Sequence, residues 1–324
     1  MRIFSGIQPT GELHLGNYFG AIQRWVELQE GNECIYCIVD YHALTNEDTA
    51  PAELRTARQE LALDLVACGI APERSILYVQ SDVPEHTELC WILGCVASYG
   101  DLTRMTQFKQ KSAGQEFINS GLFYYPVLQA ADILLYKADH VPVGEDQVQH
   151  LEESRRIARR FNFRFGETFP EPEPILGEGA RIMSLADPGS KMSKSAGPDH
   201  YIGLMEPETA IRKKVRSAVT DVGLTAGQEI SPGVANLFSL LELVAPADVA
   251  KGFREDHQSG KLLYKDLKES LFAHLMETLR PIRARRQELE AKGIGDEILA
   301  AGAERARAIA RGTMREVRSR VGLG

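Results

Sequence analysis

The sequence predicts an α/β protein in which a doubly wound, Rossmann-like parallel-sheet domain is followed by an all-helical domain. Over roughly the first 145 residues, short apolar runs alternate with longer stretches of helical periodicity, as in a parallel sheet whose strands are joined by helices. After residue 200 the apolar residues recur almost only at helical spacing. A length of 324 residues fits about two domains, which we expect at residues 1–200 and 201–324.

The expected strands are four short apolar runs, at residues 2–7, 33–44, 75–80 and 140–144. The run at 33–44 (ECIYCIVDYHAL) is nearly continuous, which is typical of a parallel strand buried on both faces. Cys34 and Cys37 in this run point to opposite faces of a strand, so we interpret them as packing residues rather than as a redox or metal pair. Cys90 and Cys95 lack further cysteines nearby, and we expect no metal-binding residues in the chain.

Helices are expected between and after these strands. In the first half, one begins at Pro51 and ends at Gly69, one begins at Pro84, and one spans residues 145–160. Residues 169–179 (FPEPEPILGEG) are interpreted as a Pro-rich connector. The second half predicts helices at residues 207–218, 234–243, 262–287 and 296–321. Pro281 should kink or break the third of these helices, and the last one has room to pack back on the first domain.

The composition excludes several classes of protein. Hydrophobic residues make up 44% and charged residues 25% of the chain, which is ordinary for a globular protein. No apolar run approaches the ~20 residues that span a bilayer, and the first residues hold no extended apolar signal segment, so we expect no membrane contact. Five cysteines, an odd number, fit a reducing cytoplasm better than a disulfide framework.

The net charge of −8 is unevenly distributed along the chain. Residues 1–200 carry 17 Lys and Arg against 28 Asp and Glu, whereas residues 201–324 carry 20 against 17. The second half is therefore the better candidate for contact with a polyanion such as nucleic acid, although solvated helix faces explain the same charges.

A polar turn, residues 8–17 (QPTGELHLGN), separates the first strand from a helix. Glycines there let the backbone approach a phosphate, the helix N-terminus favours negative charge, and His14 and Asn17 can donate to phosphate oxygens. No Lys follows Gly16, so the turn is not a P-loop, and the dinucleotide fingerprint is also absent. Taken alone, the motif is equally compatible with an ordinary strand-to-helix turn.

A second motif, residues 191–195 (KMSKS), lies in a segment rich in Gly, Ser and Pro. Two lysines on a mobile loop can close onto a polyphosphate and follow its changing charge. A solvated basic loop is the plainer interpretation, but it is hard to maintain once both motifs occur in one chain.

The two motifs resemble the HIGH and KMSKS signatures of the class I aminoacyl-tRNA synthetases, and the whole chain resembles the bacterial tryptophanyl-tRNA synthetases. Further segments carry this resemblance: residues 4–9 (FSGIQP), 105–109 (MTQFK), 130–136 (AADILLY), 141–147 (VPVGEDQ), 180–185 (ARIMSL) and 218–221 (AVTD). The related tyrosyl enzymes share only parts of these segments.

The resemblance implies an enzyme that activates L-tryptophan with ATP and Mg²⁺ to tryptophanyl-adenylate and pyrophosphate, then transfers tryptophan to the 3′ end of its tRNA. It implies a catalytic domain at residues 1–200, with a helical insertion and the KMSKS loop, and an anticodon-binding domain at residues 201–324. It also implies a homodimer in the cytoplasm.

The same resemblance assigns roles to single residues. The expected catalytic residues are His14, Asn17, Lys191 and Lys194. These four are expected to form the ATP site together with Gln8, Pro9, Thr10, Gly16, Gly144, Glu145, Asp146, Ile182, Met192, Ser193 and Ser195. The tryptophan pocket is expected to comprise Asp132, which would accept the indole N–H, and Phe4, His42, Tyr125, Gln129, Val141, Val143 and Gln147.

One position departs from the family pattern, and three rival functions stay open. Gln129 stands where the family commonly has methionine, and its amide either adds a hydrogen bond beside the indole site or faces water. The rivals are a tyrosyl-tRNA synthetase, a smaller nucleotidylyltransferase, and a catalytically silent tRNA-binding paralogue. Intact His14, Asp132, Lys191 and Lys194 weigh against the last of these.

Overall fold

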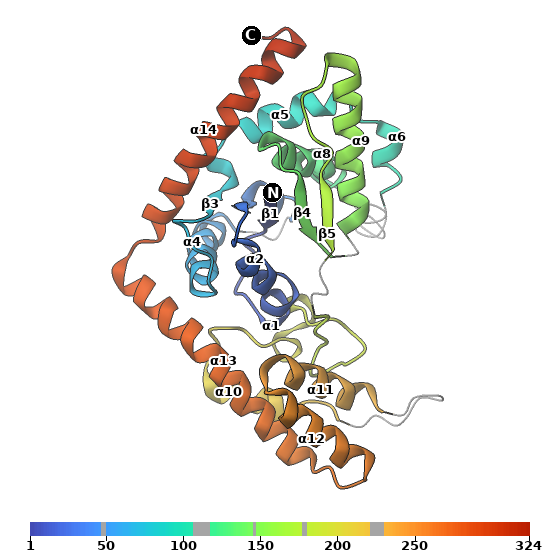
Figure 1. Ribbon diagram of the computed structural model, residues 1–324, viewed down its shortest axis with the longest axis vertical. Coiled ribbons are helices and arrows are strands. Elements are labelled where there is room, and N and C mark those ends of the chain that lie inside the picture. The colour runs from blue at the N-terminus through green and yellow to red at the C-terminus, as the bar shows by residue number, and fades with distance from the viewer. Residues whose placement is uncertain (47–49, 106–116, 145–146, 177–179, 221–229) are drawn as a thin grey trace.

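The computed structural model describes residues 1–46, 50–105, 117–144, 147–176, 180–220 and 230–324. Within them a parallel sheet has the order β3-β2-β1-β4-β5 (Figure 1). Its strands are β1 (Arg2–Ile7), β2 (Glu33–Ile38), β3 (Ile76–Val79), β4 (His140–Val143) and β5 (Glu173–Leu176). The chain builds outward from β1 to β3 and then crosses to the other side of β1. This reversal between β1 and β4 is where open α/β sheets bind their ligands, at the carboxyl ends of the strands.

Both faces of the sheet are buried, as the near-continuous apolar run predicted. Cys34 and Tyr36 of β2 belong to one hydrophobic cluster, whereas Ile35 and Cys37 belong to the other. The prediction that Cys34 and Cys37 pack on opposite faces is therefore confirmed. The cluster that contains Tyr36 continues into the second half of the chain.

Helices cover both faces of the sheet and make up the rest of the described fold. They are α1 (Leu15–Asn17), the π-helical turn η1 (Tyr18–Ile22), α2 (Gln23–Leu28), α3 (Asp40–Ala43), α4 (Pro51–Ala67), η2 (Gln80–Asp82), α5 (Glu85–Gly94), α6 (Tyr99–Leu102), α8 (Ser120–Leu135), α9 (Val148–Phe165), η4 (Lys194–Ala196), η5 (Pro198–His200), α10 (Glu208–Ser217), α11 (Pro232–Val244), α12 (Ala247–Gln258), α13 (Tyr264–Lys292) and α14 (Gly295–Val321). No helix among the described residues is both long and apolar enough to cross a lipid bilayer.

The structure corrects three details of the predicted elements. The strand predicted at 33–44 ends at Ile38, and the rest of the apolar run forms the short helix α3 at the carboxyl end of the sheet. The predicted connector at 169–179 contains the edge strand β5, where Pro174 is tolerated. Helix α13 continues through Pro281, so the helix is not broken there.

Helix α14 runs along β3, at the edge of the sheet (Figure 1). The approach is close at Gly302, where an added Cβ would lie 1.8 Å from the carbonyl oxygen of Leu77. Arginines of α14 fasten the helix further: Arg305 donates to the carbonyls of Pro72 and Ser75. The helix thereby covers the edge that an unpaired strand would expose.

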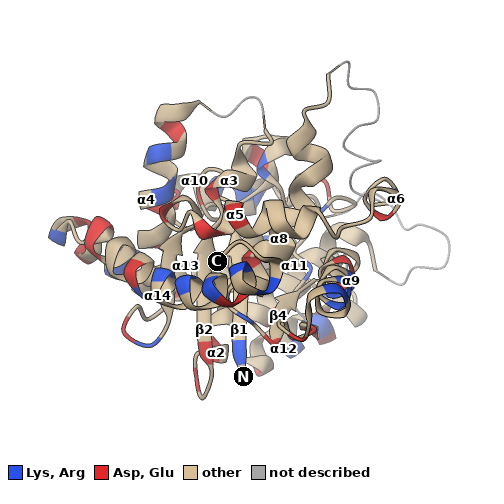
Figure 2. Cartoon of the chain, turned by 90° about the horizontal axis from the view of Figure 1, so that it is seen from above, with Lys and Arg blue, Asp and Glu red and all other residues tan. Residues whose placement is uncertain are grey.

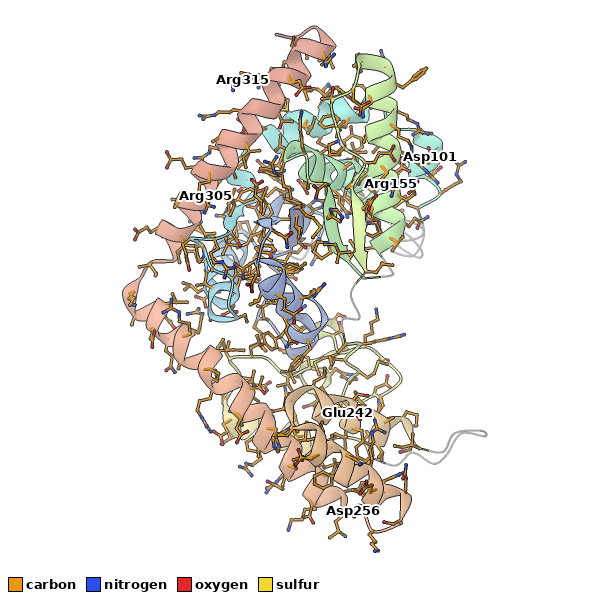
Figure 3. The ribbon with its side chains drawn as sticks, viewed as in Figure 1. Asp101, Arg155, Glu242, Asp256, Arg305 and Arg315 are labelled. Atoms are coloured by element: carbon orange, nitrogen blue, oxygen red, sulfur yellow. The ribbon has the colours of Figure 1, made fainter. Side chains whose placement is uncertain are left out.

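Helix α14 carries both acidic and basic residues along its length (Figure 2). Figure 3 shows Arg305 and Arg315 at two levels of this helix. Arg318 pairs with Glu88 of α5 through two hydrogen bonds, one of them 2.7 Å long. Much of the positive charge of the second half is thus used inside the molecule.

Candidate active site

A cavity of about 670 Å³ opens where the order of the strands reverses. Its walls come from the turn after β1, the end of β4, and the segment around residues 180–192. The lining residues are His14, Gly16, Asn17, Gly20, Ala21, Arg24, Trp25, Pro142, Val143, Gly144, Ile175, Ala180, Arg181, Ile182, Lys191 and Met192.

His14 and Asn17 fix each other at the start of α1. The backbone N–H of His14 donates to Oδ1 of Asn17 at 3.1 Å, and the backbone N–H of Gly16 donates to Nδ1 of His14 at 3.1 Å. These two bonds form a capping box. Since Nδ1 accepts, the ring proton sits on Nε2, and since Oδ1 of Asn17 accepts, its amide nitrogen is the donor end.

The imidazole of His14 is held neutral. Burial, and to a smaller extent the positive charge of Lys194, together lower the pKa of His14 to about 4. His14 therefore offers a neutral N–H donor at physiological pH.

Gly16 has a steric reason to be glycine. A Cβ at this position would lie 2.9 Å from Nδ1 and Cε1 of His14, so any side chain would displace the imidazole. Gly16 thus preserves the geometry of the capping box as well as access to the cavity.

The KMSKS segment is anchored at its first two residues. Lys191 pairs with Met183 in an antiparallel bridge, and the N–H of Met192 donates to the carbonyl of Ile182 at 2.9 Å. Lys191 is exposed at the cavity, whereas Met192 and Ile182 are buried at its wall. Asn236 of α11 holds the base of the segment by donating to the carbonyls of Met183 and Ser184, both at 3.2 Å.

Lys194 points away from the cavity lining and toward the first motif. Its ammonium donates to the carbonyl of Thr10 and, at 2.9 Å, to the carbonyl of Glu12. Burial lowers the pKa of Lys194, and the nearby carboxylate of Glu12 opposes that shift. The two signature motifs are therefore in direct contact. Ser193 and Ser195 share a hydroxyl hydrogen bond of 2.8 Å next to this contact.

A second polar cluster centres on Asp132 of α8, which is 1% exposed. Its carboxylate accepts three hydrogen bonds: from Nε2 of His42 at 2.8 Å, from Nε2 of Gln80 at 2.7 Å and from Nδ1 of His86 at 2.6 Å. Burial alone would raise the pKa of Asp132, but the hydrogen bonds and charges of His42 and His86 outweigh it and lower this pKa to about 2. Asp132 is therefore an ionised acceptor.

Tyr125, Gln129 and Asp132 occupy positions i, i+4 and i+7 of α8 and so share one face of the helix. The hydroxyl of Tyr125 lies 2.6 Å from Nε2 of His150, and its ring meets that of His42 edge-on at 6.3 Å. Gln129 is half-buried.

Phe4, in β1, stacks on Tyr136 at 5.7 Å and is buried, as is Val141 of β4. Gln147 caps α9, its N–H donating to the carbonyl of Gly144 at 2.9 Å.

The structure brings seven of the fifteen predicted ATP-site residues together around the cavity. Seven line the cavity: His14, Gly16, Asn17, Gly144, Ile182, Lys191 and Met192. Gln8, Pro9 and Thr10 follow β1 outside the lining, and Glu145 and Asp146 lie outside the described residues. Val143, expected in the tryptophan pocket, also lines this cavity.

Sequence reasoning missed several residues at these two places. Arg24, Trp25 and Arg181 line the cavity, and Gln80 and His86 hold Asp132. Arg24 lies about two helical turns beyond Asn17, a spacing that gives a usable signal. Gln80 and His86 lie in the same β3–β4 connection as Asp132 but are 52 and 46 residues away from it, so no local pattern links them.

Comparisons with known proteins show which family the chain belongs to. The sequence profile of the family described as tRNA synthetases class I (W and Y) matches residues 1–280. Tryptophan–tRNA ligase 2 of Streptomyces avermitilis is 47% identical over 330 residues, covering 99% of this chain and 97% of the relative. A tryptophan–tRNA ligase of Helicobacter pylori is 45% identical over 329 residues, with coverages of 99% and 98%.

Solved structures point the same way. Tryptophanyl-tRNA synthetase from Campylobacter jejuni, complexed with ADP and tryptophan, matches with a TM-score of 0.87 and 36% identity over 100% of both chains. Tyrosyl-tRNA synthetase from Archaeoglobus fulgidus, at 23% identity and a TM-score of 0.67 over 88% of this chain and 89% of its own, shares the fold. The chain therefore belongs to the class I tRNA synthetases for tryptophan and tyrosine, and within them to the tryptophan–tRNA ligases.

Proposed function

We propose that this chain activates L-tryptophan with ATP, giving tryptophanyl-adenylate and pyrophosphate, and then transfers tryptophan to the 3′ end of its tRNA. The observation that carries the proposal is the single cavity that joins the His14–Asn17 turn to Lys191 at the switch point of the sheet. A buried, ionised carboxylate on α8, Asp132, supplies the complementary acceptor for an indole N–H.

The reaction needs positioning and charge stabilisation rather than a nucleophile from the protein. The tryptophan carboxylate attacks the α-phosphorus of ATP in line, and pyrophosphate leaves. His14 Nε2–H and the amide of Asn17 donate to the α-phosphate, where negative charge is redistributed. Lys191 reaches the β- and γ-phosphates, and Lys194 joins it after leaving the carbonyls of Thr10 and Glu12.

The remaining ATP contacts are assigned from the family resemblance, and the lining of the cavity supports those of Gly16, Gly144, Ile182 and Met192. Ile182 and Met192 border the adenine, and Gly16 lets the backbone approach the phosphates. We assign the ribose to Gly144, Glu145 and Asp146. Further ATP contacts are assigned to Gln8, Pro9, Thr10, Ser193 and Ser195.

Mg²⁺ enters with ATP and neutralises charge on the leaving pyrophosphate. Within the described residues no three His, Cys, Asp or Glu side chains converge as a metal site. In this proposal the ion would be bound by the phosphate oxygens of ATP, with Lys191 and Lys194 as the protein's own cations.

Tryptophan is assigned to the other side of β1 and β4. Asp132 accepts the indole N–H, Phe4, His42, Val141 and Val143 wall the ring, and Tyr125 and Gln147 take the amino group. Gln129 shares the helix face of Tyr125 and Asp132, which supports a place beside the substrate rather than in the core.

The partners we propose are the tRNA for tryptophan and a second copy of the chain. We place the protein in the cytoplasm. Exposed aromatic side chains of α5, α6 and α9 support the homodimer: Trp91 is 73% exposed and Phe163 95%. Phe163 borders a hollow of about 560 Å³ together with Cys95 and Arg160.

The test is pyrophosphate exchange into ATP with each of the twenty amino acids in turn. Exchange that depends on tryptophan alone supports the proposal. Exchange that depends on tyrosine instead contradicts the proposal, and so does the absence of exchange with all twenty amino acids.

A further inference from the structure

Three buried side chains donate hydrogen bonds to the carboxylate of Asp132, and they are distributed unevenly over its two oxygens. Oδ1 receives two of them, from Gln80 at 2.7 Å and from His86 at 2.6 Å. Oδ2 receives one donor from the described residues, His42 at 2.8 Å. A carboxylate oxygen accepts at about two positions, so Oδ1 is full and Oδ2 retains one acceptor position.

Two buried tyrosines, Tyr78 and Tyr136, hold the other side of the His86 ring. Its Nε2 lies 2.9 Å from the hydroxyls of both Tyr78 and Tyr136, and its ring packs on both tyrosine rings. Burial raises the pKa of both tyrosines well above the usual range, so these hydroxyls stay protonated. A hydroxyl both donates and accepts, and the pair therefore holds His86 whether or not Nε2 carries a proton.

Gln80 is oriented just as firmly. Its Oε1 accepts the backbone N–H of Tyr41 at 3.1 Å, which leaves Nε2 as the end that faces Asp132. Gln80 and His86 are both 0% exposed, so neither side chain has solvent as an alternative partner.

We propose that His86 and Gln80 are positioning residues for substrate selection, which fill Oδ1 of Asp132 and so reserve Oδ2, beside His42, for the indole N–H. The inference rests on the proposed function, because it requires tryptophan as the substrate. According to this inference, recognition of the indole N–H depends on the orientation of the Asp132 carboxylate as well as on its presence. When either donor to Oδ1 is lost, the carboxylate turns toward the vacated space and Oδ2 moves away from the indole nitrogen.

The test compares two substrates that differ at the indole N–H. β-(3-Benzothienyl)-L-alanine has sulfur in place of the N–H and nearly the same shape as tryptophan. The quantity measured is the ratio of kcat/KM for tryptophan to kcat/KM for this analogue in pyrophosphate exchange. A hydrogen bond to an ionised group predicts a ratio of about 10- to 100-fold for the unaltered chain.

Three variants probe the donors. His86→Leu and Gln80→Met each remove one donor to Oδ1 at similar volume, and each should lower the ratio to within about three-fold of unity. The loss should fall on KM for tryptophan and leave KM for ATP unchanged. His86→Asn retains a donor at the position of Nδ1 and should keep the ratio near that of the unaltered chain.

A matched control separates positioning from loss of stability. Gln29 is a buried glutamine, 6% exposed, whose amide bonds Gly69, Ala71 and Ser75. Gln29→Leu should destabilise the fold and leave the substrate ratio unchanged.

The outcomes are distinguishable. The inference is overturned if the ratio is unchanged in folded His86→Leu and Gln80→Met. It is also overturned if the ratio falls equally in His86→Asn and His86→Leu. If His86→Leu does not fold, the result for Gln80→Met decides. A ratio near unity in the unaltered chain overturns this inference while tryptophan-dependent exchange still stands. Loss of that exchange itself overturns the proposed function.

Discussion

His14 acts at the scale of a single residue, because its neighbours decide both its tautomer and its charge. The backbone N–H of Gly16 donates to Nδ1 of His14, so the ring proton of the neutral imidazole is on Nε2. Burial and the ammonium of Lys194 both oppose a second proton on the ring. A neutral donor in this place binds phosphate oxygens by hydrogen bonding and does not change its charge when the reaction proceeds.

The pKa of His14 is the first prediction. In the ATP-free chain the ring should stay neutral from pH 8 down to about 5, with a midpoint near 4. Lys194→Met removes one of the two causes and should raise the midpoint, while burial, the larger cause, keeps it below 6.5. Histidine Cε1–H chemical shifts followed by NMR measure both midpoints. A His14 midpoint at or above 6.5 in the unaltered chain would contradict this description.

At the scale of elements, the docking of α14 on β3 depends on small residues. Ala303, Ala306 and Ala310 are buried in the cluster on this side of the sheet, and Gly302 brings the helix against the carbonyl of Leu77. The sequence predicted this helix from its periodicity. It did not predict the contact, because a glycine within a helix looks the same whether it faces solvent or a strand.

Two glycines of α14 provide a matched pair for the second prediction. Gly302→Ala puts a methyl group into the backbone of β3 and should destabilise the fold by about 1–3 kcal/mol. Gly312→Ala meets nothing within 4 Å and should stabilise the helix by up to about 1 kcal/mol. Urea unfolding of the two variants measures both changes. Equal effects of the same sign would show that α14 does not approach β3 this closely.

At the scale of the whole molecule, one buried arginine joins the two halves of the chain. Arg286 of α13 pairs with Asp64 of α4 at 2.9 Å and with Glu60 and Glu290. Burial raises the pKa of Asp64 to about 6, because it outweighs the hydrogen bond and charge of Arg286 that lower it. The folded chain therefore binds the Asp64 proton more tightly than the unfolded chain.

The sign of the third prediction follows from this linkage. The stability that Asp64 contributes is complete below pH 3.8 and is lost as the pH rises through about 6. Relative to Asp64→Asn, the free energy of unfolding of the unaltered chain should fall by roughly 2 kcal/mol between pH 4 and 7, since one pKa unit corresponds to about 1.4 kcal/mol. Urea unfolding at both pH values checks this. A difference that is constant or grows with pH would contradict the raised pKa.

The sequence predicted the architecture better than the polar contacts, for a physical reason. Hydrophobic periodicity is local, so β1, β3, α4, α11 and α14 were predicted within a few residues of their bounds. The short edge strand β5 was missed because its prolines favour an irregular connector. The first motif was predicted from its sequence because His14 and Asn17 bond within one turn. Gln80 and His86 were missed, and His42 was expected near Asp132 only from the family resemblance, because these three donors come from separate turns and helices.

The central claim is that the two signature motifs act together on ATP and tryptophan. Its most direct test is single-turnover adenylate formation at saturating ATP and tryptophan, for the unaltered chain and for Lys194→Ala. The ammonium of Lys194 should bind the pyrophosphate more tightly as the α–β bond breaks, so its loss should slow the first-order rate by roughly 100- to 1000-fold. Tryptophan affinity should stay near that of the unaltered chain, since Lys194 contacts Thr10 and Glu12 rather than the Asp132 cluster. Absence of tryptophanyl-adenylate with the unaltered chain, or an unchanged rate in Lys194→Ala, would contradict the account.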